Sequence, residues 1–354
     1  MLIPLFFVPL VVATLFSFFS TPLTILLSKR LGLTDNPKTH KHPKVVHAYT
    51  VPRGGGLPIF FALLSSLLFL PLNKPLIGIL VGATIALTVG LLDDYYEEKI
   101  SPLIRLASNF LVAGCVVMAG VQINFITNPV QGGIVKLDQI QIFLPLSSII
   151  ALFWIAWCMN FVGFSGGVDG QLPGFVAISA TTIGILSLNF TEDVAQWPVI
   201  ALAGITAGAY LGFLPWNFYP QKIIPGYGGK SLAGFLLATL SILSGAKLAT
   251  AILVLGIPLT DALFVVFNRI RKGRLPFWGD RGHLHHRLLD LGWGKRRIAL
   301  FYWCSSAILG IMALNLNSKQ KFYTIILLPI LFLVLILWIN YLSTSLRPPG
   351  RGNG

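Results

Sequence analysis

Long apolar blocks dominate this chain and limit the folds that it can adopt. Residues 2–27, 57–72 and 322–342 are three such blocks, and a helix of about 20 apolar residues crosses the roughly 30 Å hydrocarbon core of a bilayer. None of the blocks alternates apolar and polar residues as the strands of a membrane barrel do. Because a helix satisfies its own backbone polar groups in lipid, the sequence predicts an all-α, polytopic membrane helical bundle.

The composition agrees with this fold class. Hydrophobic residues make up 55% of the 354 residues and charged residues 11%, with a mean hydropathy of +0.78. About a quarter of the residues of a soluble protein are charged, so a soluble fold is excluded. We expect a single domain over residues 1–354 with about eleven transmembrane helices. The expected spans are 2–27, 54–72, 75–92, 103–121, 142–159, 173–189, 197–215, 231–244, 248–268, 300–315 and 322–344.

The basic residues gather on one side of the predicted membrane. Of the 26 Lys and Arg residues, 21 fall in alternate loops, in the C-terminal tail or at Arg105. Loops rich in Lys and Arg stay in the cytoplasm, so we expect a bacterial inner membrane protein with its N-terminus outside and its active-site loops and C-terminus in the cytoplasm. The formal net charge of +14 then reflects topology and contact with anionic membrane lipids, and no nucleic acid partner is expected.

Two adjacent acids, Asp93 and Asp94, stand at the cytoplasmic end of an apolar block, with Lys99 shortly after them. Neighbouring carboxylates at a membrane boundary repel each other unless a cation shares them. Mg²⁺ prefers oxygen ligands and binds phosphates, so it fits this need, with Mn²⁺ as the alternative ion. A solvated cluster of acids at a helix end is the other interpretation.

A glycine-rich loop follows Asn160 and holds a single acid, Asp169, directly before Gly170. Glycines let a backbone approach a phosphate or a sugar closely and turn its amides toward an anion. The pattern therefore favours a binding loop, and a plain tight turn is the alternative.

The cytoplasmic loop over residues 269–299 concentrates arginines and histidines. Its candidates for phosphate binding are Arg274, Arg281, His283, His285 and His286. A guanidinium fork matches phosphate oxygens, and a histidine near neutral pH donates hydrogen bonds or carries charge. A topology loop would explain the arginines but not three histidines in four residues. Zinc is a competing ligand, although the spacing is not that of the usual zinc patterns.

Two further segments are basic or glycine-rich. The first cytoplasmic loop holds His47 and Arg53 before three glycines, and it either clamps a lipid phosphate or anchors the topology. The segment 226–231 looks like part of a Walker A loop. That motif needs a glycine at Ile224 and a preceding strand, so a P-loop is excluded.

Together these motifs resemble the polyprenyl-phosphate N-acetylhexosamine-1-phosphate transferase family, the integral membrane enzymes that begin bacterial cell-envelope glycans. The resemblance covers nearly the whole chain. It rests on the paired aspartates, on Asn160 with Asp169-Gly170, on the entry loop around Pro52-Arg53 and on the histidine loop 281–286. Three positions depart from the family. Gly163 and Gly166 stand where its loop has a second Asn and a further Asp, and Tyr227 stands where it has an acid.

The resemblance implies that a polyprenyl phosphate attacks the diphosphate of a UDP-N-acetylhexosamine, with N-acetylglucosamine as the expected sugar, and releases UMP. It implies that Asp94 and Asp169 orient Mg²⁺, and that Asp93 keeps the lipid phosphate deprotonated or shares the metal. Phosphate-stabilising roles fall to Arg281, His283, His285 and His286. Substrate-binding roles fall to Asn160, Gly170, Arg53, His47, Lys99 and Arg274. A homodimer is a further expectation.

Two other classes of protein share these features. A carrier or flippase for a polyprenyl-linked intermediate would use the same basic loops without breaking a bond. A catalytically silent relative would act as a scaffold for other envelope enzymes. The residues Gly166 and Tyr227 favour the carrier or flippase, because neither can replace a metal-binding carboxylate at neutral pH.

Overall fold

The computed structural model describes residues 3–38, 47–96, 100–190, 192–245, 248–275 and 281–345. Nearly all of the regular structure in these residues is helical, as the apolar blocks predict. The helices are α1 (Ile3–Arg30), α2 (Gly56–Leu64), α3 (Ser66–Phe69), α4 (Lys74–Tyr95), α5 (Pro102–Met118), α6 (Leu146–Phe164), α7 (Gln171–Leu188), the 3-10 turn η1 (Val194–Gln196), α8 (Trp197–Asn217), α9 (Gly226–Leu243), α10 (Leu248–Val254), α11 (Gly256–Arg271), α12 (Leu284–Asp290), α13 (Lys295–Asn315) and α14 (Ser318–Ser345).

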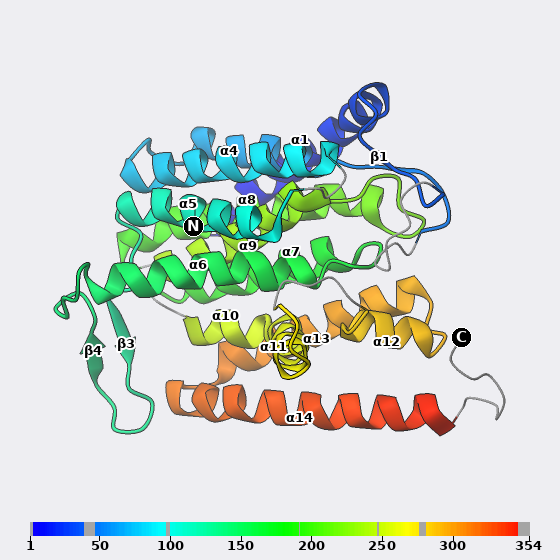
Figure 1. Ribbon diagram of the computed structural model, residues 1–354. Coiled ribbons are helices and arrows are strands. Elements are labelled where there is room, and N and C mark those ends of the chain that lie inside the picture. The colour runs from blue at the N-terminus through cyan, green and yellow to red at the C-terminus, as the bar shows by residue number, and fades with distance from the viewer. Residues whose placement is uncertain are drawn as a thin grey trace.

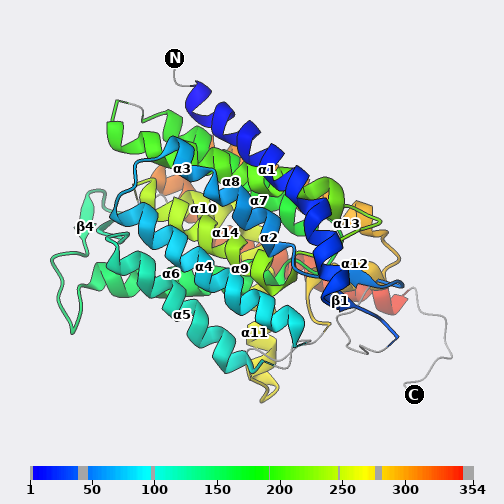
Figure 2. The ribbon, with the colours of Figure 1, turned by 90° about the horizontal axis from the view of Figure 1, so that it is seen from above.

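Two short antiparallel ribbons complete the fold. Strand β1 (Thr34–Asp35) pairs with β2 (Val51–Pro52), and β3 (Phe125–Thr127) pairs with β4 (Ile134–Lys136). Figure 1 shows the β3–β4 ribbon at one end of the helical bundle and β1 with α12 at the other end. Figure 2 shows the same separation from above. The two ribbons therefore mark opposite ends of the bundle.

The expected number of spans was too high. Every expected span contains helix, but in the described residues seven helices are long and apolar enough to cross a membrane, or eight if the bent pair α10–α11 is one span. The segments α2–α3 and α5 are shorter apolar helices. Helix α9 has 15 of its 18 residues buried, so protein rather than lipid surrounds it and the strong hydropathy of a lipid-facing span is not needed. The chain is thus a multi-pass membrane protein with seven or eight long spans in its described part.

Close helix packing depends on small residues. On α8, a β-carbon added to Gly204, Gly208 or Gly212 would lie 2.4, 2.2 and 2.2 Å from backbone oxygens of α1. These glycines recur every fourth residue, so they line one face of α8 and let the two backbones touch. Figure 2 shows α1 running alongside α8. A second close approach joins α4 to α9, where a β-carbon on Gly90 would lie 2.2 Å from the Cα of Gly228.

The expected span 248–268 is broken. Helices α10 and α11 meet at an angle of 79°, with Leu255 between them and Pro258 in the first turn of α11. Proline has no N–H to offer the carbonyl four residues earlier, so the helical ladder is interrupted at this point. As a result α11 leaves the direction of the other helices, as Figure 2 shows.

Candidate active site

The entry loop forms a buried ionic cluster. Arg53 Nη2 lies 3.0 Å from Asp35 Oδ2, and His47 Nε2 lies 3.8 Å from the same oxygen. Burial lowers the pKa of His47 below its usual value, although Asp35 opposes this change. The loop is fixed to the segment before α9, because Gly55 N donates to Ile224 O and Ile224 N donates to Pro52 O. These two bonds hold the part of the entry loop that carries Arg53 against the segment that leads into α9.

Asp93 forms an ion pair with a basic residue of the next helix. At the end of α4, Asp93 Oδ1 accepts from Arg105 Nε at 2.7 Å, and the Asp93 side chain is only 2% exposed. The guanidinium of Arg105 also stacks on the ring of Tyr227, 5.4 Å from its centroid. The Tyr227 hydroxyl donates to Asn109 Oδ1 at 3.2 Å. The phenol at position 227 therefore belongs to a packed polar cluster with Arg105 and Asn109.

Asp94 caps the start of α9. Its Oδ1 accepts the Tyr227 backbone N–H at 3.1 Å, an arrangement that also places a negative charge at the positive end of the α9 dipole. Gly226 has a positive φ of 65°, and a β-carbon there would collide with the Asp94 carboxylate. The second oxygen of Asp94, Oδ2, is buried and has no hydrogen-bond partner. It is thus a carboxylate oxygen available to a ligand.

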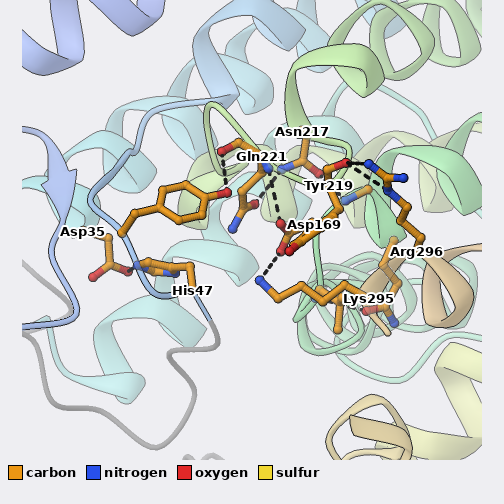
Figure 3. A network of polar contacts seen from close by, with 12 residues as sticks. Asp35, His47, Asp169, Asn217, Tyr219, Gln221, Lys295 and Arg296 are labelled. Carbon is orange, nitrogen blue, oxygen red and sulfur yellow. Dashed lines mark hydrogen bonds and ion pairs between the residues drawn. The ribbon is translucent and has the colours of Figure 1, made fainter. Parts of the chain in front are cut away.

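Asp169 is held by groups from two other segments. Its Oδ1 accepts from Lys295 Nζ at 2.9 Å, and its Oδ2 accepts from the backbone N–H of Gln221 at 3.3 Å. Figure 3 shows these contacts, together with Asn217 and the entry-loop residue His47. The charges of Asp169 and Lys295 both act on His47. The network therefore joins the entry loop, the glycine-rich loop and the N-terminus of α13.

The glycine-rich loop lies against the histidine loop. A β-carbon added to Gly167 would lie 2.0 Å from Nε2 of His285. The three histidines pack on one another. The rings of His283 and His285 are stacked with their centroids 5.6 Å apart, and those of His285 and His286 are tilted with their centroids 4.3 Å apart. Glycine at position 167 is thus needed for the approach of His285.

Asp261 anchors the histidine loop to α11. Its carboxylate accepts from His283 Nδ1 at 2.9 Å and from the Leu284 backbone N–H at 2.8 Å. Arg269 lies 3.4 Å from His283 Nε2 and can only donate, so His283 carries its proton on Nδ1 when neutral. Asp261 is fully buried. Sequence reasoning considered it as an acid that could compensate for Tyr227 but gave it no site role, because it lies inside an apolar block with no motif around it.

The other two histidines are neutral at pH 7. Burial, reinforced by the neighbouring histidines, lowers the pKa of His285 well below its usual value. Burial and the nearby Arg281 lower the pKa of His286 to about 4. Both rings are 2% exposed, and their Nδ1 atoms have no hydrogen-bond partner. They can offer hydrogen bonds to a substrate but no positive charge.

Several expected site residues make contacts elsewhere. Asn160 donates to Ala156 O within its own helix at 2.7 Å. Gly170 uses both backbone polar groups internally, donating to Asn217 and accepting from Trp303. Arg281 pairs at 2.8 Å with Asp290 on the surface. Arg274 is exposed beyond the end of α11, and Lys99 lies outside the described residues.

The acidic side chains of the site can hold a divalent metal ion through Asp94. No three His, Cys, Asp or Glu side chains among the described residues are grouped so that they could hold a metal together. Asp169 has both oxygens engaged, whereas Asp94 has Oδ2 open. Mg²⁺ commonly takes one or two carboxylates and completes its shell with water and substrate phosphates. The residues present fit an ion of this kind, held on the protein side by Asp94.

Two lysines that sequence reasoning treated as topology signals belong to this site. Lys295 pairs with Asp169. Lys230, on the second turn of α9, acts electrostatically on both Asp94 and His285. The segment 226–231 resembles a phosphate-binding motif only in part, and that partial likeness was the signal that could have identified Lys230.

The chain also matches known proteins over most of its length. A family model described as glycosyl transferase family 4 matches residues 76–245. The chain is 30% identical over 346 residues to the decaprenyl-phosphate N-acetylglucosaminephosphotransferase of Mycobacterium tuberculosis, covering 88% of this chain and 81% of the relative. It is 28% identical over 340 residues to the undecaprenyl-phosphate alpha-N-acetylglucosaminyl 1-phosphate transferase of Thermotoga maritima, covering 96% and 97%. A Yersinia pestis protein with the latter name is 26% identical over 323 residues, covering 88% and 84%.

Proposed function

Since the chain belongs to the polyprenyl-phosphate N-acetylhexosamine-1-phosphate transferases of glycosyl transferase family 4, we propose that it transfers N-acetylglucosamine 1-phosphate from a UDP-sugar to a polyprenyl phosphate. The products are polyprenyl-diphosphate-N-acetylglucosamine and UMP. The reaction begins a cell-envelope glycan in the bacterial inner membrane, with the N-terminus outside and the active site and C-terminus in the cytoplasm. The whole chain acts as one transferase domain, and a homodimer stays a prediction.

One observation carries this proposal: five segments distant in sequence meet around a mixed cluster of acids and cations. The entry loop, the end of α4, the glycine-rich loop, the start of α9 and the histidine loop are linked through Arg53, Asp94, Lys230, Asp169 and His285. Figure 1 places β1 and α12, which border this cluster, at the same end of the bundle. A cluster of this kind at a membrane boundary suits two phosphate-bearing substrates of which one is a lipid.

The proposed reaction is a single displacement. An oxygen of the lipid phosphate attacks the phosphorus that carries the sugar and forms a new P–O–P bond. The bond from that phosphorus to the oxygen it shares with the uridine phosphate breaks, and UMP leaves with this oxygen. The protein contributes mainly by positioning the two substrates and stabilising charge on the phosphate oxygens.

Each part of the site has a role in this reaction. Arg53 and Lys295 supply positive charge, and the neutral His285 and His286 donate hydrogen bonds to phosphate oxygens. Asp93, tied to Arg105, orients that cation toward the lipid phosphate. When Mg²⁺ or Mn²⁺ is bound, Asp94 would hold it and the ion would neutralise charge on the diphosphate. Asp169 holds Lys295 in place. Asp169 would become a second ligand of the metal ion only if its ion pair with Lys295 opened.

Release of UMP tests the proposal. Purified protein is supplied with polyprenyl phosphate, Mg²⁺ and a panel of UDP-sugars, and nucleotide products are separated chromatographically. We expect UMP with UDP-N-acetylglucosamine, and a loss of two or more orders of magnitude in Asp94→Asn. A carrier or a silent relative would release no UMP. Lys319→Gln, at the opposite membrane face, is the matched control and should retain the full rate.

A further inference from the structure

We propose that a groove beside the entry loop binds an anionic membrane phospholipid, with the lipid phosphate held by Lys29 and Lys222. The groove has a volume of about 390 Å³ and lies between the C-terminal part of α1, the entry loop, the end of α8 and the segment that follows α8. The inference goes beyond the proposed function, because no side chain that lines the groove has a role in the transfer reaction. It names a second ligand, held outside the active site.

The wall that α1 contributes changes from apolar to charged along the groove. Ile25 and Pro22 lie one and two turns before Lys29, which stands in the last turn of α1. Residues four and seven apart share one face of a helix. Only 22% of the span window of α1 is buried, so much of this helix borders lipid. A groove that begins among apolar residues and ends at a lysine has the polarity of a phospholipid, with its chains below and its phosphate above.

The end of α8 supplies an aromatic ring and a second cation. Trp216 is half-buried, and Lys222 Nζ lies 5.0 Å from the centroid of its ring. The backbone fixes this pair, because Lys222 N donates to Trp216 O at 2.8 Å. Tryptophan is enriched at the level of the lipid headgroups, and a lysine near the membrane surface attracts anionic lipids. Both residues therefore suit a groove at the membrane boundary.

The charge of the groove selects an anion. None of the lining residues is acidic, whereas Lys29 and Lys222 are both exposed cations. The ring of Trp216 is neutral, so its contact with Lys222 orients the ammonium group without cancelling its charge. Lysines that served only as a topology signal would need no groove with an apolar floor beside them. The combination of floor and charge indicates a lipid with a phosphate.

Hydrogen-bonded segments separate the groove from the reacting groups. Tyr49 and Gln221 both line the groove, and Tyr49 Oη donates to Gln221 O at 3.0 Å. The backbone N–H of Gln221 donates to Asp169 Oδ2 at 3.3 Å, as Figure 3 shows. Neither Asp94 nor any residue of the histidine loop lines the groove. A phosphate on the two lysines is therefore held away from the reacting cluster, which favours a membrane phospholipid over the polyprenyl substrate.

Native mass spectrometry of the full chain in detergent, titrated with phosphatidylglycerol, measures the affinity for the first bound lipid. In Lys29→Gln/Lys222→Gln we expect this affinity to fall about 10- to 100-fold, because two lysines near the headgroup lose their charge. Phosphatidylcholine has no net charge, so its affinity should not change. Ile25→Trp keeps both lysines but fills the apolar floor, and it should also weaken phosphatidylglycerol binding. The matched control, Arg30→Gln/Lys272→Gln, removes the same charge outside the groove and should stay within a few fold of the wild type.

The possible outcomes separate this lipid site from its alternatives. Unchanged phosphatidylglycerol affinity in Lys29→Gln/Lys222→Gln overturns the proposal, and so does an equal loss in the control, which would mean general attraction to basic residues. A parallel loss of polyprenyl phosphate affinity also overturns it, because the groove would then hold the substrate. The thermal midpoint identifies a misfolded Ile25→Trp protein, in which case Ile25→Phe takes its place. The proposed function fails separately, if the wild type binds phosphatidylglycerol but releases no UMP from any UDP-sugar.

Discussion

The contact between the glycine-rich loop and the histidine loop can be tested by adding a single carbon. In Gly167→Ala the new Cβ would lie 2.0 Å from Nε2 of His285, more than an ångström inside ordinary van der Waals contact. The His285 ring is buried between two other histidines and has little room to turn. Either the ring or the loop backbone that carries Asp169 must therefore move by about 1 Å.

The size of the effect follows from that displacement. Overpacking a buried site costs about 1–3 kcal/mol of folding free energy, so we expect a lower thermal midpoint in detergent. A misplacement of about 1 Å in a catalytic group lowers a rate about 100-fold, so UMP release should fall to near one per cent. The matched control is Gly163→Ala, because its new Cβ finds only Lys230 Cβ, at an ordinary 3.6 Å.

The same variant provides its own second test. Removing the ring in Gly167→Ala/His285→Ala should restore the thermal midpoint lost in Gly167→Ala, since the collision partner is gone. If Gly167→Ala keeps the rate and midpoint of Gly163→Ala, the two loops are not in contact and the proposed assembly of the site is incorrect. The same conclusion follows if the double variant is no more stable than the single one.

Three other predictions concern the supports of the site. Asp261→Ala leaves the buried His283 Nδ1–H without its acceptor and should cost about 3–5 kcal/mol of stability, measured by thermal unfolding in detergent; an unchanged midpoint would contradict the anchoring role. Because the pKa of His286 falls to about 4 on folding, its stabilising effect is complete above about pH 6.5 and is lost as the pH drops from there toward 4. The midpoint of His286→Gln should therefore depend less on pH in that window, and equal slopes would refute this assignment. Tyr227→Phe removes the hydrogen bond to Asn109 and should cost about 1 kcal/mol with little effect on UMP release; a loss of activity as large as in Asp94→Asn would show that the hydroxyl acts in the reaction.

Local sequence patterns predicted where the helices lie, but they overestimated how many of these helices are long enough to span a membrane. Each apolar block became helix, because apolar content and the need for internal hydrogen bonds act within a segment. The number of long spans was overestimated because hydropathy does not reveal what surrounds a helix. Helix α9 begins with Gly226 and carries Lys230, yet it is buried on nearly all sides by other helices. The bend between α10 and α11 was also missed, although Pro258 offered a signal for it.

The candidate site was predicted in part. The paired aspartates, Asp169 and the histidine loop lie at one end of the bundle because alternate loops of a helical bundle share one face, and the distribution of lysine and arginine predicts which loops these are. Sequence reasoning gave no site role to Asp261, Lys230 or Lys295. Asp261 bonds to His283, 22 residues away, and Lys295 pairs with Asp169, 126 residues away, while Lys230 acts on Asp94 from another helix. Only packing brings such pairs together, and no local pattern reports it.

The close approach of Gly90 to Gly228 has a consequence for how freely this sequence can vary. Gly90 lies four residues before Asp94 in α4, and Gly228 lies two residues before Lys230 in the first turn of α9, so their contact sets the spacing of this acid and this lysine. One methyl group between the two backbones would shift an acid relative to a lysine without touching either. By contrast, only 17% of the span window of α14 is buried, so its lipid-facing residues can exchange among Leu, Ile and Val. We therefore expect that residues near the contact of Gly90 with Gly228 tolerate few substitutions and that residues far from it tolerate many, even where their hydropathy is the same.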